Sequence, residues 1–227
     1  MALDFRIKAV GFDMDGTFMH TRVDYVKMDN IVTDELLSLG VPETDIDRRD
    51  GSKMAMERGI AWLIVHGRAD AAAGIRERVG VRATAVELEH ADEAEPFPGS
   101  IDTLRLLKKR GYPVGVLTRG SRQYAETVLG NAGVLKEFDA VVARDDYPEE
   151  DSKPSPMALR HLGKRLGVPA ENILYLGDHK VDWMTADAAG AEFIGVTSGS
   201  YSQQDWETKI GPQVRTIGCV GDLRDLL

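Results

Sequence analysis

Short apolar runs alternate with longer amphipathic stretches through the C-terminal part of the chain. The runs are rich in Val, Ile and Leu at successive positions, which is typical of strands buried on both faces. Strands that alternate with helices predict an α/β fold, a doubly wound, Rossmann-like parallel sheet with helices on both sides. The expected strands are "AVGFD" (9–13), "PVGVLT" (113–118), "FDAVVA" (138–143), "NILYLGD" (172–178) and "EFIGVT" (192–197). The expected helices cover 100–110, 121–132, 156–166 and 180–189.

Local signals support these boundaries. Ser155 followed by Pro156 is typical of a helix start, because Ser caps free backbone amides and Pro suits the first helical position. Gly190 is a typical helix stop before the next strand. A last strand, "VRTIG" (214–218), and a final helix, "VGDLRDLL" (220–227), complete the expected core.

Residues 18–94 break this alternation and read as mainly helical. The segment "VRATAVEL" (81–88) is ambiguous between helix and strand, and the two prolines of "EPFPG" (95–99) mark a stiff return to the core. We therefore expect an inserted α-helical cap domain over 18–94 and a discontinuous catalytic core made of 1–17 and 95–227. The expected cap helices contain "NIVTDELLSL" (30–39), "SKMAMERGIAWLIVHG" (52–67) and "ADAAAGIRERV" (69–79).

Composition narrows the class of partner. The chain has 227 residues and a net charge of −9, with 37 acidic against 28 basic residues. This balance argues against nucleic acid or an anionic membrane as the main partner. A small anionic substrate stays open, because a metal ion or a few local cations can reverse the field inside a pocket. The single cysteine, Cys219, excludes an intrachain disulfide and a multi-cysteine metal site.

No targeting segment is visible in the sequence. The start, "MALDFRIKAVGFD", interrupts its apolar residues with charges, so a signal-peptide core is not expected. The longest uncharged apolar run, "GIAWLIV" (59–65), is too short to span a bilayer. We expect a cytoplasmic protein, and nothing in the sequence points to a particular oligomeric state.

Polar side chains gather where the expected strands end. In an open α/β sheet, ligands bind at the carboxyl ends of the strands, so residues at these positions are expected to face one site. Each residue also has an ordinary explanation when it is taken alone: a turn, a strand end, a solvated loop charge or a first-turn helix acid. Their joint occurrence, each at the correct end of its own strand, favours a functional site. The candidates are Asp13, Asp15, Thr118, Lys153, Asp178 and Asp182.

These groups have complementary chemistry. A carboxylate cluster without a cation is unfavourable, so it implies a hard divalent ion, and Mg²⁺ favours oxygen ligands shared with phosphate. A Thr hydroxyl, a Lys and the helix-start amides that follow Thr118, at Arg119 and Gly120, can hold phosphoryl oxygens. One carboxylate can attack phosphorus to form an aspartyl phosphate, and another can transfer a proton to the leaving oxygen.

The histidines are not expected to belong to the metal site. His179, beside Asp178, can be read as a metal ligand, but a positioned or solvent-facing histidine fits a hard, oxygen-rich ligand set better. The others, His20, His66, His90 and His161, show no metal-ligand spacing and are expected to be structural.

In this order and spacing, the residues resemble the haloacid dehalogenase-like hydrolase superfamily. "DMDGT" (13–17) looks like its first motif, "VLT" (116–118) its second, Lys153 in "SKPSP" its third and "GDHKVD" (177–182) its fourth. The resemblance covers the whole core, and the insert after the first motif is similar to the type-one cap of phosphoglycolate phosphatases and β-phosphoglucomutases.

The resemblance implies a role for each candidate. Asp13 would be the nucleophile and Asp15 the general acid/base. The metal site would consist of Asp13, the backbone carbonyl of Asp15 and Asp178, with Asp182 in support. Thr118 and Lys153 would bind the transferring phosphoryl group. The presence of Asp15 favours phosphate-ester chemistry, because the dehalogenase branch lacks this second aspartate.

We therefore expect a Mg²⁺-dependent phosphatase that hydrolyses a small phosphorylated metabolite, phosphoglycolate-like or a sugar phosphate, through an aspartyl phosphate. A phosphosugar mutase of the same superfamily is the alternative; a receiver-type phosphoacceptor or a non-catalytic binding protein is disfavoured by the insert and by the complete set of catalytic groups. Two departures from the phosphoglycolate-phosphatase pattern, His20 where Asp is common and His179 where Ser is common, bear on the substrate rather than on the reaction. Cap cations that could select an acidic substrate are Arg48, Arg49 and Lys53.

Overall fold

The computed structural model describes residues 5–46 and 51–227. The chain divides into two compact units. The core unit consists of Met1–Arg22 and His90–Leu227, and the helical unit is Val23–Glu89. No helix among the described residues is both long and apolar enough to cross a membrane.

The core unit is built on a six-stranded sheet with the order β5-β4-β1-β6-β7-β8, and every neighbouring pair is parallel. Val10 of the central strand β1 lies opposite Val114 of β4 and Leu174 of β6. All the strands expected from the sequence are present, which confirms the predicted α/β class. Their bounds are β1 Ala9–Phe12, β4 Val114–Leu117, β5 Ala140–Val142, β6 Ile173–Gly177, β7 Glu192–Val196 and β8 Thr216–Ile217.

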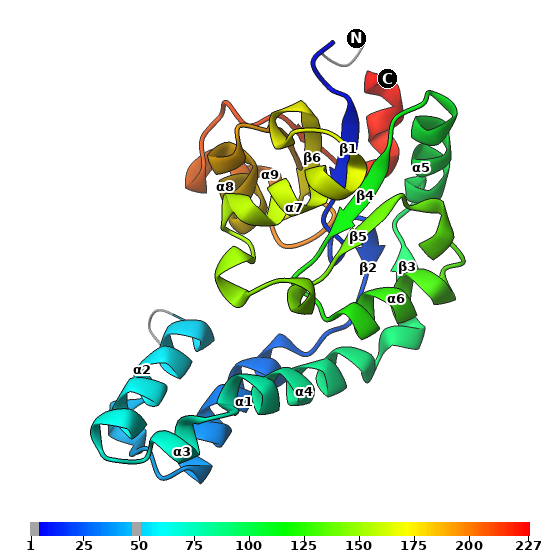
Figure 1. The fold of residues 1–227 in the computed structure, drawn as a ribbon. Coiled ribbons are helices and arrows are strands. Elements are labelled where there is room, and N and C mark those ends of the chain that lie inside the picture. The colour runs from blue at the N-terminus through cyan, green and yellow to red at the C-terminus, as the bar shows by residue number, and fades with distance from the viewer. Residues whose placement is uncertain (1–4, 47–50) are drawn as a thin grey trace. The chain divides into compact units, whose positions relative to one another are not determined.

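Helices cover both faces of this sheet, as Figure 1 shows. Two of them, α7 (Pro156–Leu166) and α8 (Lys180–Ala189), pack against each other on one face. On the other face, α5 (Ser100–Lys109) packs against the C-terminal 3-10 helix Val220–Leu226, where an ordinary helix was expected. The remaining core helices are α6 (Arg122–Asn131) and α9 (Gln203–Lys209). The sequence prediction missed α9, although Ser202 and Asp205 form a capping box at its start.

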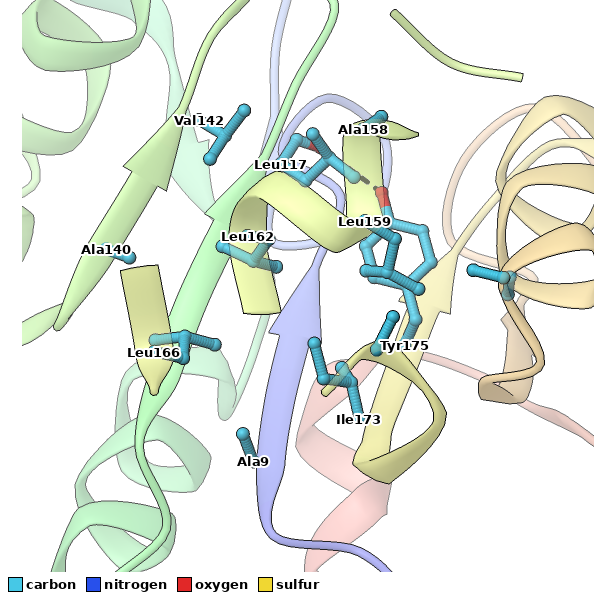
Figure 2. Close-up of a cluster of buried hydrophobic side chains, with 13 residues drawn as sticks. Ala9, Leu117, Ala140, Val142, Ala158, Leu159, Leu162, Leu166, Ile173 and Tyr175 are labelled. Carbon is cyan, nitrogen blue, oxygen red and sulfur yellow. Dashed lines mark hydrogen bonds between the residues drawn. The ribbon is translucent and has the colours of Figure 1, made fainter. Parts of the chain in front are cut away.

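Close packing of α7 on the sheet explains the two glycines in the middle strands. Leu159, Leu162 and Leu166 lie on one face of α7 and are buried over the strands, as Figure 2 shows. A Cβ atom on Gly11 would lie 2.9 Å from the Leu162 side chain, and one on Gly115 would lie 2.7 Å from it. Both glycines therefore let the helix approach the sheet closely.

A small antiparallel pair accompanies the core sheet. It joins β2 (Met19–His20) to β3 (Glu95–Pro96), with Met19 opposite Pro96. The prediction did not include this pair, because two-residue strands carry no periodic signal. It brings together the points at which the chain leaves and re-enters the core unit.

The helical unit contains α1 (Tyr25–Ser38), α2 (Ser52–Val65), α3 (Ala69–Ala72) and α4 (Ile75–Leu88). Leu36, Leu63 and Ile75 lie at the centre of its apolar core. The ambiguous segment 81–88 is helical. The prediction of a continuous helix over 69–79 was wrong, because Gly74 adopts a left-handed conformation with φ of +74° and separates α3 from α4.

Candidate active site

The carboxyl ends of β1, β4 and β6 carry polar side chains that are almost fully buried. Asp13 follows β1, Thr118 follows β4 and Asp178 follows β6, and their exposed fractions are 5%, 4% and 4%. Because these three strands are neighbours in a parallel sheet, their ends lie at one edge. The sequence therefore brings all three groups to the place where such sheets bind ligands.

Lys153 joins this group from the loop before α7. Its Nζ donates to Asp13 Oδ1 at 2.5 Å and to Asp182 Oδ1 at 2.6 Å. A third hydrogen bond, at 3.2 Å, joins it to the hydroxyl of Tyr175, which in turn donates to the carbonyl of Leu117 at 3.2 Å. A fully buried tyrosine thus ties the lysine to the strand end that carries Thr118.

Asp13, Asp178 and Asp182 form a group of acids that could hold a metal ion. One carboxylate oxygen from each lies within 4.8 Å of the others. Asp178 is fixed by the backbone amide of Ser200, which donates to its Oδ2 at 2.6 Å. Gly16, with φ of +79°, and Gly199 come so close that a Cβ on either would collide with the Asp178 carboxylate.

Asp15 presents its carboxylate to a different set of partners. The Tyr124 hydroxyl donates to Asp15 Oδ1 at 2.6 Å, and the Thr118 hydroxyl donates to Oδ2 at 3.4 Å. The side chain of Thr21 also hydrogen-bonds to this carboxylate. The two aspartates of the first motif therefore face different neighbours, although only one residue separates them.

Burial and mutual repulsion set the protonation of these acids. Burial raises the pKa of Asp13 well above its usual value; Lys153 opposes the rise, while Asp182 and Asp178 add to it. Burial also raises the pKa of Asp178, again with a contribution from Asp182. Burial lowers the pKa of Lys153, but Asp13 and Asp182 outweigh it, so the pKa lies well above the usual range. This cluster of Asp13, Asp178, Asp182 and Lys153 thus holds more acids than cations, a balance that a divalent ion would correct.

The predicted phosphoryl-binding turn follows β4. The amide of Gly120 donates to Thr118 Oγ1 at 2.9 Å, and Ser121 caps α6 by accepting from the amide of Tyr124. Arg119 is exposed, and its carbonyl accepts from Arg144 Nη1 at 3.3 Å. Thr118 and Lys153 thus lie within the buried cluster, whereas the Arg119 side chain lies at the surface and the Gly120 amide is turned toward Thr118.

Neither histidine near the motifs belongs to the acidic group. His179 caps α8, and its Nδ1 accepts from the amide of Val181 at 3.4 Å. Burial lowers the pKa of His179, which favours the neutral ring. His20 is exposed and packs beside Phe97 with ring centroids 5.7 Å apart.

Sequence reasoning did not single out Tyr124, Tyr175 or the loop 198–200. Tyr175 lies in the middle of an apolar strand, where a tyrosine reads as a core residue. Tyr124 lies in the first turn of α6, six positions after Thr118. Of these, only Tyr124 has a position in the sequence that could have indicated the site, because the first turn of a helix that starts at a strand end faces the same sheet edge.

A doubly wound parallel sheet with buried acids, a lysine and a hydroxyl at its carboxyl edge is the arrangement expected of an α/β protein that handles phosphoryl groups. Residues 7–190 match the haloacid dehalogenase-like hydrolase family, and the chain belongs to this family. The expected superfamily is confirmed, and with it the class of phosphoric monoester hydrolases.

Curated relatives and a solved structure agree with this assignment. The chain is 31% identical to the phosphoglycolate phosphatase of Chromobacterium violaceum, with 97% of the chain and 96% of the relative covered. It is 28% identical to phosphoglycolate phosphatase 1 of Pseudomonas aeruginosa, with 97% and 78% covered. A haloacid dehalogenase-like hydrolase from Bacteroides fragilis superposes with a TM-score of 0.64 at 28% identity, with 96% and 99% covered.

Proposed function

We propose that this chain is a Mg²⁺-dependent phosphatase that hydrolyses a small phosphorylated acid or sugar phosphate through an aspartyl phosphate on Asp13. One observation carries the proposal. The Asp13 carboxylate is buried, lies 2.5 Å from the Lys153 ammonium group and belongs to the group of three acids at the sheet edge. A nucleophile, a cation for phosphoryl oxygens and a metal-binding group therefore meet at one point.

The donor set fits Mg²⁺. Its members are carboxylate oxygens, which hard divalent ions prefer, and burial raises the pKa of both Asp13 and Asp178. In this proposal Asp13, Asp178 and the backbone carbonyl of Asp15 would hold the ion, with Asp182 in support. A bound Mg²⁺ would neutralise charge on the acids and on the phosphoryl oxygens.

The two aspartates of the first motif divide the chemistry. An Asp13 oxygen forms a bond to phosphorus as the phosphorus–oxygen ester bond breaks, and Asp15 gives its proton to the leaving oxygen. The Asp15 carboxylate then takes a proton from a water molecule as the water oxygen bonds to phosphorus and the bond between phosphorus and the Asp13 oxygen breaks. Inorganic phosphate leaves, and both side chains return to their starting states.

Thr118 and Lys153 hold the phosphoryl group during these steps. The hydroxyl of Thr118 and the ammonium group of Lys153 supply donors at the sheet edge, and the backbone amide of Arg119 in the following turn would add another. The amide of Gly120 instead holds the Thr118 hydroxyl in place. Lys153 also contacts Asp182, so the same lysine links the nucleophile to the acids of α8.

A small phosphorylated acid is the first choice of substrate, because the relatives named above are phosphoglycolate phosphatases. We assign substrate selection to the insert, residues 18–94, as a cap. Its candidate cations cannot be placed, since Arg48 and Arg49 lie outside the described residues, as does the side chain of Lys53. They stay candidates on the basis of sequence alone.

Phosphate release from p-nitrophenyl phosphate, phosphoglycolate and a panel of sugar phosphates tests the proposal. We expect the parent protein to be active with Mg²⁺ and Asp13→Asn to be inactive. Turnover by Asp13→Asn at the parent rate would contradict the proposal.

Three variants, Arg48→Ala, Arg49→Ala and Lys53→Ala, test the role of the cap in substrate selection. A loss confined to phosphoglycolate, with p-nitrophenyl phosphate unchanged, would support selection by these cations, and unchanged rates on every substrate would exclude them.

A further inference from the structure

Tyr124 is a buried hydroxyl that the reaction as described does not use. Its side chain is 1% exposed, and it lies in the first turn of α6. The ring packs against the turn after Thr118, since a Cβ on Gly120 would lie 2.7 Å from it. The backbone of this turn therefore fixes the direction in which the phenol points, toward the end of β1.

The Asp15 carboxylate accepts hydrogen bonds of unequal length from Tyr124 and Thr118. Tyr124 donates to Oδ1 at 2.6 Å, whereas the Thr118 hydroxyl is 3.4 Å from Oδ2. A hydrogen bond of 2.6 Å to a carboxylate is in the range of strong, charge-assisted bonds, and one of 3.4 Å is weak. Thr21 also hydrogen-bonds to this carboxylate. The short bond from Tyr124 nevertheless holds Oδ1 more firmly than the bond from Thr118 holds Oδ2.

Free rotation would make the two oxygens of an aspartate equivalent. The terminal torsion of Asp is broad and roughly two-fold, so packing alone does not choose which oxygen faces a substrate. A rigid hydrogen-bond donor on one oxygen fixes which of the two oxygens faces the substrate. Proton transfer depends on holding the donor within hydrogen-bond reach of the leaving oxygen, so this choice bears directly on rate.

We propose that Tyr124 is a positioning residue: it holds Asp15 through Oδ1 and presents Oδ2, on the Thr118 side, as the oxygen that exchanges the proton. The inference rests on the proposed function, because it needs Asp15 to act as the general acid/base. Tyr124 itself gives up no proton and forms no bond to substrate. It acts by limiting the rotation of Asp15.

A leaving-group series separates this role from simple packing. p-Nitrophenyl phosphate has a leaving group that departs without a proton, whereas phenyl phosphate and an alkyl phosphate need one. Tyr124→Phe removes only the hydroxyl and keeps the ring against Gly120. Since hydrolysis of the aspartyl phosphate is common to all substrates, the quantity compared is kcat/KM, which reports the steps up to release of the leaving group. We expect the kcat/KM of Tyr124→Phe to fall about tenfold on the alkyl phosphate and less than about twofold on p-nitrophenyl phosphate.

Three companion variants complete the experiment. Asp15→Asn should show the same leaving-group trend with a larger loss, and adding Tyr124→Phe to Asp15→Asn should cause no further selective loss. Tyr112→Phe is the matched control, since Tyr112 precedes β4 at the opposite edge of the sheet, and it should leave all rates unchanged. Thermal unfolding of each variant checks that the fold is kept.

Each outcome decides the inference. A selective loss in Tyr124→Phe that disappears in the Asp15→Asn background supports it. An equal loss on all substrates, or no loss, alongside a selective loss in Asp15→Asn overturns the role of Tyr124 and leaves the proposed function standing. Equal losses in Asp15→Asn itself would overturn the acid role of Asp15 and the inference with it.

Discussion

The two units of the chain differ in how their buried charged side chains are surrounded. In the core unit, Asp13, Lys153 and Asp182 are buried and contact one another at the end of the sheet. In the helical unit, Lys27 and Glu89 form an ion pair at the surface, with side chains 50% and 41% exposed. Its buried acid Glu35 is paired with two partly exposed arginines, Arg78 and Arg82. Surface pairs contribute little to stability, whereas buried charges are expensive and persist where they have a use.

This difference distinguishes charged groups that are placed for a reaction from charged groups that only accompany folding. The acids of the core unit repel one another, so the site is maintained at a cost to the stability of the sheet that carries it. The helical unit has an ordinary apolar centre around Leu36 and Leu63, and its ion pairs join opposite charges, at the surface between Arg76 and Glu57 and around the buried Glu35. Loss of a charged group should therefore have a large effect in the acidic cluster of the core unit and a small one at an exposed pair of the helical unit.

The largest effect is expected for Asp13→Asn. It removes the nucleophile and keeps the shape of the side chain, so kcat should fall by about 10⁴-fold or more. Because a neutral amide relieves the repulsion from Asp178 and Asp182, the melting temperature of the metal-free protein should not decrease. Steady-state kinetics and thermal unfolding measure the two quantities, and a large drop in melting temperature would show that the acid is structural.

Metal removal should come next in size. EDTA should abolish phosphatase activity and added Mg²⁺ should restore it, while Ca²⁺ substitutes poorly because its coordination is larger and looser. Mg²⁺ at 100 times its dissociation constant should also stabilise the fold by about 2.7 kcal/mol. Full activity after exhaustive chelation would contradict the metal site, and an unchanged Mg²⁺-induced stabilisation in Asp178→Asn would remove Asp178 from it.

A buried and an exposed lysine provide the direct comparison between the units. Lys153→Met leaves two buried acids without their cation and should cost about 3–5 kcal/mol of stability, besides most of the activity. Lys27→Met breaks only the exposed pair with Glu89 and should cost less than about 1 kcal/mol. Chemical denaturation of both variants gives the free energies of unfolding. Similar losses in the two variants would contradict the expected difference between the buried and the exposed lysine.

A smaller effect is expected at Asp146, which shows that a charged group of the core unit need not belong to the site. Partial burial raises the pKa of Asp146, but hydrogen bonds from Arg122 and from the amide of Ala143, with the charges of Arg122 and Arg165, outweigh burial and lower the pKa. The stabilisation by Asp146 is thus fully present above the unfolded pKa, about 3.9, and fades as the pH falls through the lower folded value. Asp146→Asn should be less stable than the parent at neutral pH and approach it in acid; a difference that does not change with pH would contradict this.

Much of the fold could be predicted because its signals are local. Apolar strands, the cap at Ser155 and the stop at Gly190 each leave a mark in a few adjacent residues. Gly74 broke an expected helix because its left-handed conformation depends on the turn between α3 and α4. The pairing of β2 with β3 joins segments far apart in the chain, so no local pattern reveals it.

The positions of the candidate site residues could be predicted because they follow local strand signals. The prediction was incomplete because their hydrogen-bond partners depend on packing. Asp13, Thr118 and Asp178 follow apolar strands, and sheet topology then brings them together. The partners of these residues are set by packing. The position of Tyr124 in the first turn of a helix placed it near the sheet edge, but not its contact with Asp15. The backbone of Ser200 reaches Asp178 from a loop, and that contact has no sequence signature.

The most direct test of the central claim, that Asp13 carries the phosphoryl group, is to trap the intermediate. Asp15→Asn should slow hydrolysis of the aspartyl phosphate while p-nitrophenyl phosphate still loads it, so the phosphoenzyme should accumulate. Rapid acid quenching followed by mass spectrometry of the peptides should find one phosphoryl group on Asp13, released by hydroxylamine and absent from the Asp13→Asn/Asp15→Asn double variant. A phosphoryl group on another residue, or burst turnover with no phosphoenzyme at any time point, would contradict the account.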